Sequence, residues 1–365
     1  MKKPGKLRLA WCALLWLAPF AGHAAANATT NVAPHELVVM QWNVQNFYDT
    51  DNAPDNPGDD EYTPRGWRHW DPNRYALKVE HLASIVAAIK PDILGLEEVE
   101  NRRVVVDLAD RLRDGYNLDY PYLVHRDSPD KRGIDNALLS RYPFTATNWL
   151  AAEPFQRETI VARFEPGGAA LTVIVNHWKS NYGARIGNLS TRTREAQTVR
   201  RAVDEQIQTD PAAAVLVMGD FNWDSDTPAF TNALRALPPD AAIRTSDRTV
   251  LYNLSAGLSA DQSGTYWYNS GKSWHSYDNI LVTHALLSTN LPTPPLKTGE
   301  PPRGAWRVVP DSFRVVRDAP LLDDAGHPQP FNELRDRKTG KFRWITGYSD
   351  PVSYTHLTLP TKRIV

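Results

Sequence analysis

The fold is predicted most directly from the stretch Val215-Leu216-Val217-Met218-Gly219-Asp220-Phe221-Asn222-Trp223-Asp224. Its four leading apolar residues indicate a buried strand, and Gly219 marks the turn that follows. Asp220 and Asn222 are two positions apart, so they share one side if the extended run continues. Carboxylate and amide oxygens at the end of a core strand suit a divalent cation and a phosphate. Because Asp and Asn are also common in turns, the interpretation depends on how the other strands end.

The residues around this stretch predict an α/β protein. A strand over 37–43 precedes a helix that opens at Asp71-Pro72 and ends before Pro91, and a second short strand follows over 92–96. This β-α-β beginning predicts helices packed on a sheet. Further helices are expected at 103–113, 189–208 and near 228–236, and further strands at 121–125, 135–140, 145–150, 159–165, 170–176, near 264–268, 276–282 and 312–317. Residues 285–343 otherwise suggest an irregular crossing segment. The Arg-rich helix over 189–208 is expected to present Arg192, Arg194, Arg200 and Arg201 to solvent.

Polar side chains repeatedly follow the apolar strands. They are Asn43, Glu98, His177, Asp220, Asn222, Asp278 and Asp350. Each has a structural alternative as a turn, surface or hydrogen-bonding residue, but together they match a site at the rim of a β-scaffold. Carboxylates can ligate Mg²⁺ or Mn²⁺, amides can donate to phosphate oxygens, and His177 can protonate a leaving group. Metal-assisted hydrolysis of a phosphate ester is therefore the predicted reaction class.

Composition and charge limit the alternatives. Twelve Trp, fourteen Tyr and 28 Pro indicate a loop-rich globular enzyme. No long linker divides residues 36–350, so we predict one domain. We also predict a monomer without a stable protein partner. The net charge is −1. Tight non-specific nucleic-acid binders usually carry a basic excess, which this chain lacks, although a local patch is compatible with its composition.

Residues 1–26 have the pattern of a secretory signal peptide. Four basic residues flank the start of an apolar run from Leu9 to Gly22, and small residues near Ala26 fit a cleavage site. Losing those four positive charges changes the net charge from −1 to −5. The run is short for a spanning helix, and Cys12, the single cysteine, lies within it. We predict an exported, periplasmic or extracellular protein whose mature chain has no transmembrane anchor and no disulfide.

An acidic loop follows the first predicted strand. It contains Asp49, Asp51, Asp55, Asp59, Asp60 and Glu61 among Pro, Gly and Asn. A solvated surface loop is the plain interpretation. A loop stabilised by structural Ca²⁺ is the alternative, because clustered flexible carboxylates suit that ion.

Several short motifs resemble those of the endonuclease/exonuclease/phosphatase superfamily. Gln41-Trp42-Asn43-Val44 is similar to its first-strand motif, and Leu96-Glu97-Glu98-Val99 to its metal-binding motif, with Glu97 in the usual Gln place. Asn176 to Ser180 resembles the motif that contains a phosphate-contacting His. Gly219-Asp220-Phe221-Asn222 and Tyr277 to Val282 resemble two later motifs, in the family's order.

This resemblance implies a four-layer α/β sandwich of two packed mixed β-sheets flanked by helices. It implies a divalent ion on Glu98 with Asn43 and Asp350 nearby. Asp220 and Asn222 would position water and phosphate, and Asp278 would orient a general-base His. That His is expected directly after Asp350, where this chain has Pro351. We therefore predict that residues 351–365 are a non-native or truncated tail and that the chain as written is catalytically impaired.

Three functions remain open from the sequence. The first is a secreted or periplasmic metal-dependent nuclease that hydrolyses phosphodiester bonds. The second is a phosphatase or lipid phosphodiesterase that acts on inositol phosphate or sphingomyelin. The third is a catalytically inactive binding protein, which the replacement of the expected His by Pro351 would explain.

Overall fold

The computed structural model describes residues 36–358, except 55, 155, 181–186, 244–246, 257, 259–261, 263, 269, 288–305, 318–319, 323, 325, 329–330, 336–341 and 347–351. The predicted signal peptide, Asp55 and Asp350 lie outside the described residues. Side chains are described as far as residue 328. Residues 33–365 belong to one compact unit.

The first sheet contains seven of the described strands. Its order is β14-β18-β1-β2-β4-β3, and β15 also pairs with β18. β1 and β2 are parallel, whereas β2 and β4 are antiparallel. The strands are β1 (Glu36–Phe47), β2 (Ile93–Val99), β3 (Tyr122–His125), β4 (Asp135–Ser140), β14 (Arg307–Val308), β15 (Arg314–Val316) and β18 (Val352–Thr358).

The second sheet also has seven described strands, in the order β5-β6-β7-β8-β13-β10-β9. β7 and β8 are parallel and β8 and β13 are antiparallel, so the carboxyl ends of β7 and β8 meet the amino end of β13. The strands are β5 (Phe144–Leu150), β6 (Thr159–Phe164), β7 (Leu171–His177), β8 (Val215–Asp220), β9 (Ala236–Leu237), β10 (Leu251–Asn253) and β13 (Asp278–Thr283).

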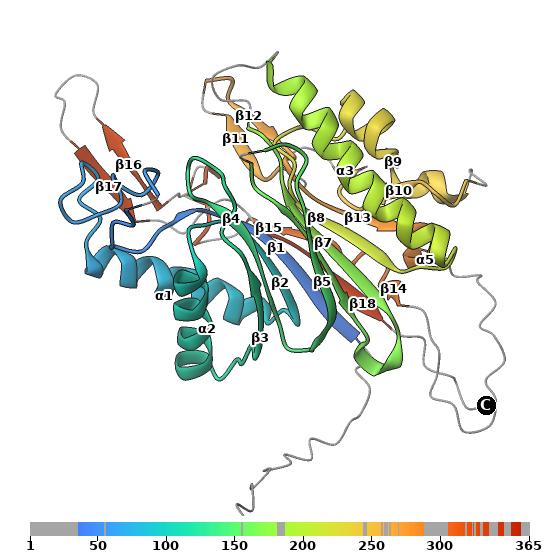
Figure 1. The fold of residues 1–365 in the computed structure, drawn as a ribbon, viewed down its shortest axis with the longest axis horizontal. Coiled ribbons are helices and arrows are strands. Elements are labelled where there is room, and N and C mark those ends of the chain that lie inside the picture. Colours follow the sequence, from blue (N-terminus) through green and yellow to red (C-terminus); the bar gives the residue numbers. More distant parts are fainter. Residues whose placement is uncertain are drawn as a thin grey trace, which may run out of the picture. The chain divides into compact units, whose positions relative to one another are not determined.

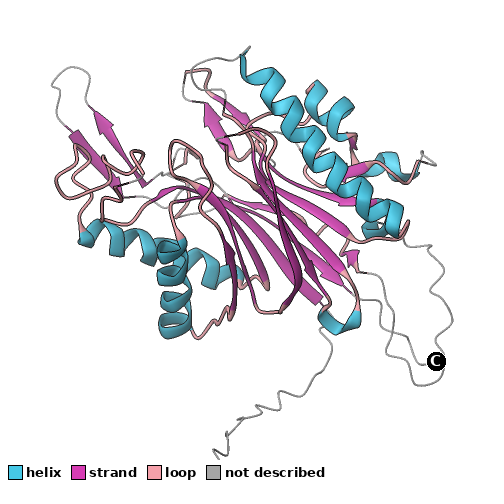
Figure 2. Ribbon diagram, viewed as in Figure 1, coloured by secondary structure: helices cyan, strands magenta, loops and turns pink. Residues whose placement is uncertain are grey.

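Alternation along the central strands produces the layers. Leu216 and Met218 of β8 pack in the core between the sheets, whereas Val215 and Val217 pack in the core beneath α3. In β1, Val39 joins the central core and Met40 the core beneath α1 and α2. A strand buried on both faces needs apolar residues at successive positions, as the 215–218 run has. The predicted four-layer α/β sandwich is thus confirmed (Figures 1 and 2).

Helices cover the outer faces of both sheets. α1 (Pro72–Ile89) begins where Asp71 accepts a hydrogen bond from the backbone N–H of Arg74, and it ends at Lys90 in the left-handed conformation. It lies with α2 (Arg102–Tyr116) on one side, and α3 (Gly187–Thr209) lies on the other (Figure 2). None of the described helices is long and apolar enough to cross a membrane. The shorter helical segments are η1 (Pro166–Gly168), η2 (Ala229–Leu234), η3 (Pro239–Ile243) and α5 (His284–Leu287).

Two expectations for the C-terminal part differ from the structure. Residues 285–343, expected to be mostly irregular, contain α5, β14 and the antiparallel pair β16 (Phe331–Arg335) and β17 (Phe342–Thr346). Residues 352–358, placed by the sequence in a tail outside the fold, form β18, which pairs antiparallel with β1 from Glu36 to Gln41. The segment Val-Ser-Tyr-Thr-His-Leu-Thr is rich in residues with high β-propensity, and β1 offers it an unpaired edge.

The Arg-rich helix α3 also departs from its expected role. Arg194 is exposed, but Arg192 and Arg200 are buried, so the expectation that all four arginines form a solvated face is wrong. Arg192 donates to the backbone oxygen of Lys179 at 2.9 Å and its guanidinium lies 4.2 Å from the ring centre of Trp223. Guanidinium groups stack readily on indole rings, which the sequence pattern of the helix does not reveal.

Candidate active site

A polar cavity of about 170 Å³ lies where the ends of β1, β2, β8 and β13 meet. Strand pairing places these ends together: Asn43 is in register with Glu97, and Asp220 with both His177 and Asp278. The cavity is lined by Asn43, Gln45, Asn46, Glu98, Arg132, Asp220, Asn222, Tyr266, Tyr277 and Asp278. Carboxylates and amides thus dominate its wall.

Glu98 is turned toward this cavity by an irregular strand end. The register of β2 with β4 shifts between Glu97 and Val99, and Glu98 adopts a positive φ of 62°. A non-glycine residue in this conformation is strained, and such strain concentrates at functional sites. Its Oε2 accepts a hydrogen bond of 2.9 Å from the backbone N–H of Asn46 and lies 3.7 Å from Nη2 of Arg132. The bulge therefore separates Glu98 from the buried Glu97 and places the Glu98 carboxylate beside the guanidinium of Arg132.

Asp220 and Asn222 form a hydrogen-bonded unit at the end of β8. The backbone N–H of Asn222 donates to Asp220 Oδ1 at 2.7 Å, and its Nδ2 donates to Oδ2 at 3.2 Å. Asn222 has a φ of 51°, so the two side chains meet through a turn and not through the continued extended run that period-2 alternation assumed. Asn43 Nδ2 also donates to Asp220 Oδ2, at 2.9 Å. The Asp220 carboxylate is thus oriented from both sheets.

Gly219 makes this arrangement possible. It has a φ of 142°, and an ideal Cβ at this position would lie 1.8 Å from the backbone oxygen of Asn176. Only glycine fits such a close approach of β8 to β7. Gly219 lies within β8 and not at the turn expected from the sequence, and it sets the spacing of the strands that end in His177 and Asp220.

His177 is buried and is not among the residues that line the cavity. Its Nε2 is 3.5 Å from Asp220 Oδ2 and 4.0 Å from Glu98 Oε1. Burial first, and then the charges of Arg157, Arg132 and Lys179, hold the pKa of His177 well below its usual value. Its imidazole is therefore neutral at pH 7. A buried neutral imidazole beside two carboxylates can donate one hydrogen bond without adding charge.

Arg157 supports the His177 segment from below. Its side chain donates to the backbone oxygens of His177 and Trp178, at 3.3 and 3.0 Å, and lies 3.5 Å from Asp130 Oδ2. Arg157 is thus a paired cation. It is a positioning residue for the strand end that carries His177.

Asp278 and Glu97 share one amide. Gln41 Nε2 donates to Asp278 Oδ1 at 2.8 Å and to Glu97 Oε2 at 2.7 Å. Burial, followed by the charge of Asp278, raises the pKa of Glu97 well above its usual value. Gln41 therefore joins the two carboxylates, one of which is Asp278, the residue that the resemblance expects to orient a histidine.

The donor set of the cavity fits a divalent cation. Three carboxylates, three Asn amides and one Gln amide line it, and Arg132 is the one cationic side chain among its described lining residues. Burial and the neighbouring charge of Asp278 raise the pKa of Asp220 well above its usual value. A bound cation would stabilise the ionised carboxylates. Oxygen ligands of this kind are those that Mg²⁺ and Mn²⁺ prefer, and Glu98, Asp220 and Asn43 would hold the ion.

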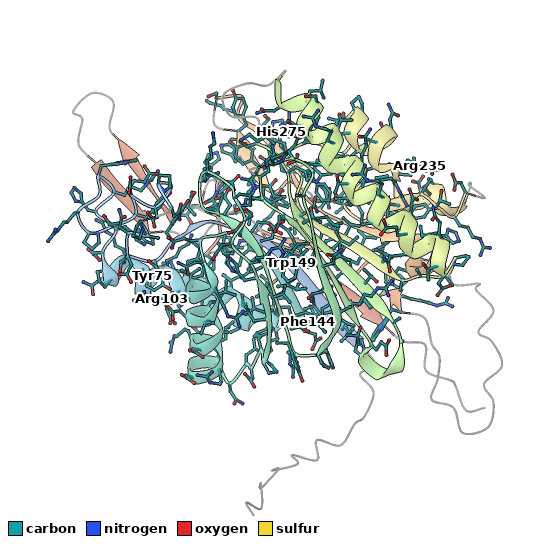
Figure 3. The ribbon with its side chains drawn as sticks, in the orientation of Figure 1. Tyr75, Arg103, Phe144, Trp149, Arg235 and His275 are labelled. Atoms are coloured by element: carbon teal, nitrogen blue, oxygen red, sulfur yellow. The ribbon has the colours of Figure 1, made fainter. Side chains whose placement is uncertain are left out.

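An aromatic hairpin forms one wall of the cavity. β11 (Tyr266–Tyr268) and β12 (Ser273–His275) pair antiparallel. The ring of Tyr266 stacks on that of Tyr277 with centres 5.0 Å apart. His275, labelled on this hairpin in Figure 3, lies 2.7 Å from Asp224 through its Nδ1, which fastens the hairpin to the segment after β8. The wall thus presents stacked aromatic rings beside the carboxylates.

The structure brings together most of the candidate site residues. Asn43, Glu98, Asp220, Asn222 and Asp278 line the cavity, and His177 contacts two of them. Asp350 lies outside the described residues. The candidate site residues named from the sequence did not include Gln45, Asn46, Arg132, Tyr266 or Tyr277. Arg132 donates a hydrogen bond of 2.5 Å to Asn46 Oδ1 at the cavity.

Comparison with known proteins agrees with this architecture. The chain resembles humanized D. rerio TDP2 at 16% identity, over 89% of this chain and 100% of that one, with a TM-score of 0.50. It resembles an endonuclease/exonuclease/phosphatase protein from Beutenbergia cavernae DSM 12333 at 16% identity, over 91% and 74% of the two chains, also with a TM-score of 0.50. These likenesses show the fold.

No curated protein sequence matches the chain significantly. The model of the Endonuclease/Exonuclease/phosphatase family, however, matches residues 38–297, a span that contains every described candidate site residue. The chain therefore belongs to the endonuclease/exonuclease/phosphatase family, whose members are phosphoric ester hydrolases.

Proposed function

We propose that this protein is a metal-dependent phosphodiesterase that cleaves nucleic acid. The observation that carries the proposal is the convergence of Glu98, Asp220 and Asp278, with the amides of Asn43 and Asn222, on one cavity at the strand ends of both sheets. A bound Mg²⁺ or Mn²⁺ would polarise a phosphoryl oxygen of the substrate. The side chains around the cavity would bind the substrate phosphate and position the attacking water.

Each cavity residue supports a distinct role. Arg132 offers a guanidinium to the substrate phosphate. Asp220 positions the attacking water as a hydrogen-bond acceptor, whereas the position expected to hold the general base is occupied by Pro351. Asn43 and Asn222 orient that carboxylate by donating to it. Neutral His177 supports Asp220 from the buried side.

The aromatic wall favours nucleic acid over a small phosphoester. Tyr266, which is 37% exposed, and Tyr277 line the cavity. Exposed aromatic rings bind single-stranded nucleic acid by stacking on its bases, irrespective of sequence. One structural neighbour with a TM-score of 0.50 and 16% identity is D. rerio TDP2 complexed with a single-strand DNA product, which fits a substrate of this kind.

A substrate panel tests the proposal. Plasmid DNA, single-stranded DNA, RNA, sphingomyelin and inositol phosphate would each be incubated with Mg²⁺ and then with EDTA. The chain as written and a Pro351→His form would be compared, because the expected general-base His is missing at that position. Metal-dependent cleavage of DNA or RNA is expected. Intact nucleic acid alongside a cleaved inositol phosphate or sphingomyelin would contradict the nuclease proposal in favour of those alternatives.

We further propose export to the periplasm or the extracellular space. The support is the signal-like pattern of residues 1–26. Fractionation of expressing cells, with N-terminal sequencing of the exported protein, checks this. A mature chain that begins near residue 27 is expected, and a cytoplasmic chain that retains Met1 or Lys2 would contradict it.

The acidic loop after β1 supports a structural Ca²⁺ ion. Asp49 and Asp59 of this loop are buried, as is Glu100, which follows β2 and accepts the backbone N–H of Asp49. Asp59 Oδ1 has no hydrogen-bond partner among the described residues. Buried carboxylates are costly unless a cation or proton compensates them. Ca²⁺ is expected to raise the melting temperature of the wild-type protein and to have a smaller effect on Asp59→Asn. Equal shifts in both proteins would contradict a calcium site at this loop.

A further inference from the structure

A separate group of potential metal ligands lies at the base of the loop that joins β3 to β4. His125 is the last residue of β3, Asp135 is the first residue of β4, and Asp127 lies between them. One ring nitrogen of His125 and one carboxylate oxygen from each Asp all lie within 4.8 Å of one another. None of the three lines the cavity described above.

The two buried members of this group face each other without a hydrogen bond. The side chains of His125 and Asp135 are 1% and 3% exposed, and His125 Nε2 lies 3.9 Å from Asp135 Oδ2. Neither atom has a hydrogen-bond partner among the described residues. The other oxygen, Oδ1 of Asp135, accepts from the backbone N–H and the hydroxyl of Ser128. The Asp135 carboxylate is thereby held in place while its second oxygen remains available to a ligand.

The chemistry of this pair suits a transition-metal ion. Burial lowers the pKa of His125 to about 4, so its imidazole is neutral at pH 7, as a metal ligand must be. Zinc binds His nitrogen and carboxylate oxygen tetrahedrally at about 2.0–2.2 Å, so two of its ligands stand about 3.4 Å apart. The two atoms, 3.9 Å apart, need to approach each other by only about 0.5 Å to bind one ion. Asp127, whose side chain is 78% exposed, can complete the set from the solvent side.

We propose that His125, Asp127 and Asp135 bind a divalent transition-metal ion of the Zn²⁺ class, which ties together the two ends of the 126–134 loop. This loop carries Arg132, which lines the cavity, and Asp130, which pairs with Arg157 beneath the His177 segment. The ion is structural. It fixes the conformation of the loop from which Arg132 reaches the cavity, and it is distinct from an ion at Glu98.

Zinc binding by the full-length chain tests this site. The protein, stripped with a chelator, is dialysed against Zn²⁺, and bound zinc is measured for wild type and for the variants His125→Gln and Asp127→Asn. Asp119→Asn is the matched control, since Asp119 is an exposed Asp just before β3. Glu98→Gln is a second control, because it changes a ligand of the ion proposed for the cavity and leaves His125, Asp127 and Asp135 unchanged. Crystals grown with Zn²⁺ provide the position of the ion by anomalous scattering.

The expected result is one tightly bound Zn²⁺ that is lost in His125→Gln and at least tenfold weaker in Asp127→Asn. Asp119→Asn and Glu98→Gln should keep it, with an anomalous peak between His125 Nε2 and Asp135 Oδ2. Unchanged zinc binding in Asp127→Asn, together with no peak at His125, overturns the proposal. Asp127 is exposed, so its variant remains informative if His125→Gln does not fold. The readout is binding, so a protein without hydrolase activity would leave the result intact.

Discussion

Replacing Glu195 by Gln is expected to change how the stability of the protein depends on pH. Glu195 lies on α3, is buried, and accepts the backbone N–H of Lys179 with both carboxylate oxygens, at 3.1 and 3.0 Å. Burial raises its pKa from 4.5 to about 7, even though the charges of Arg157, Arg192 and Lys179 act in the opposite direction. Lys179 follows the strand end that carries His177, so Glu195 fastens this segment to α3.

The sign and size of the effect follow from that pKa. The folded state retains the proton up to about pH 7, whereas the unfolded chain releases it near 4.5. The stabilisation is therefore fully present below pH 4.5 and is lost as the pH rises through 7. At about 1.4 kcal/mol for each tenfold change in the protonation equilibrium, the loss is about 3 kcal/mol. Gln keeps the acceptor without titrating, so Glu195→Gln should lack this component.

Urea denaturation between pH 4.5 and 8 measures the difference. The free energy of unfolding of wild type, relative to Glu195→Gln, should fall by about 3 kcal/mol across this range. Glu205→Gln, an exposed carboxylate on the same helix, is the matched control and should run parallel to wild type. Curves for wild type and Glu195→Gln that stay parallel, or that diverge in the opposite direction, would refute the reasoning.

Three further changes probe the site. Gly219→Ala should destabilise the fold by more than about 2 kcal/mol in urea denaturation, because its Cβ would meet the backbone oxygen of Asn176 at 1.8 Å; an unchanged midpoint would contradict this. Tyr266→Ala should raise KM for single-stranded DNA by roughly 5- to 150-fold through lost stacking while kcat changes little, and an unaltered KM would remove the aromatic wall from the binding argument. Pro351→His should raise the rate of phosphodiester hydrolysis on the order of 10²–10⁴-fold, and equal turnover by both forms would show that the general base is assigned wrongly.

The strands and their ends were the predictable part of the fold. Runs such as 215–218 are apolar at successive positions because a strand between two cores must be, so their location could be inferred from the sequence. Asp71-Pro72 likewise marked the start of α1. The C-terminal pairings were not predictable. The partner of β18 is β1, which is distant in sequence, and β16 and β17 pair within a polar segment that was expected to be irregular.

The site was predictable in its composition but not in its geometry. Periodicity could not foresee the bulge that turns Glu98 toward the cavity, or the turn through which Asn222 reaches Asp220. Arg132 and Tyr266 come from loops and a hairpin whose placement depends on tertiary contacts, so their sequence context carried no signal. His125 and Asp135 are ten residues apart, and the pairing of β3 with β4 is what brings them together.

The most direct test of the metal-dependent site is Glu98→Gln in a phosphodiester hydrolysis assay with Mg²⁺. Glu98 is the cavity carboxylate that reaches both Arg132 and the His177 side of the site. The Pro351→His form is the background, and its cleavage is expected to require metal and to be abolished by EDTA. Adding Glu98→Gln to this form should lower the rate of cleavage by at least about 100-fold while leaving the melting temperature of the protein unchanged. Cleavage at the parental rate by a folded Glu98→Gln protein, or cleavage that persists in EDTA, would contradict the account.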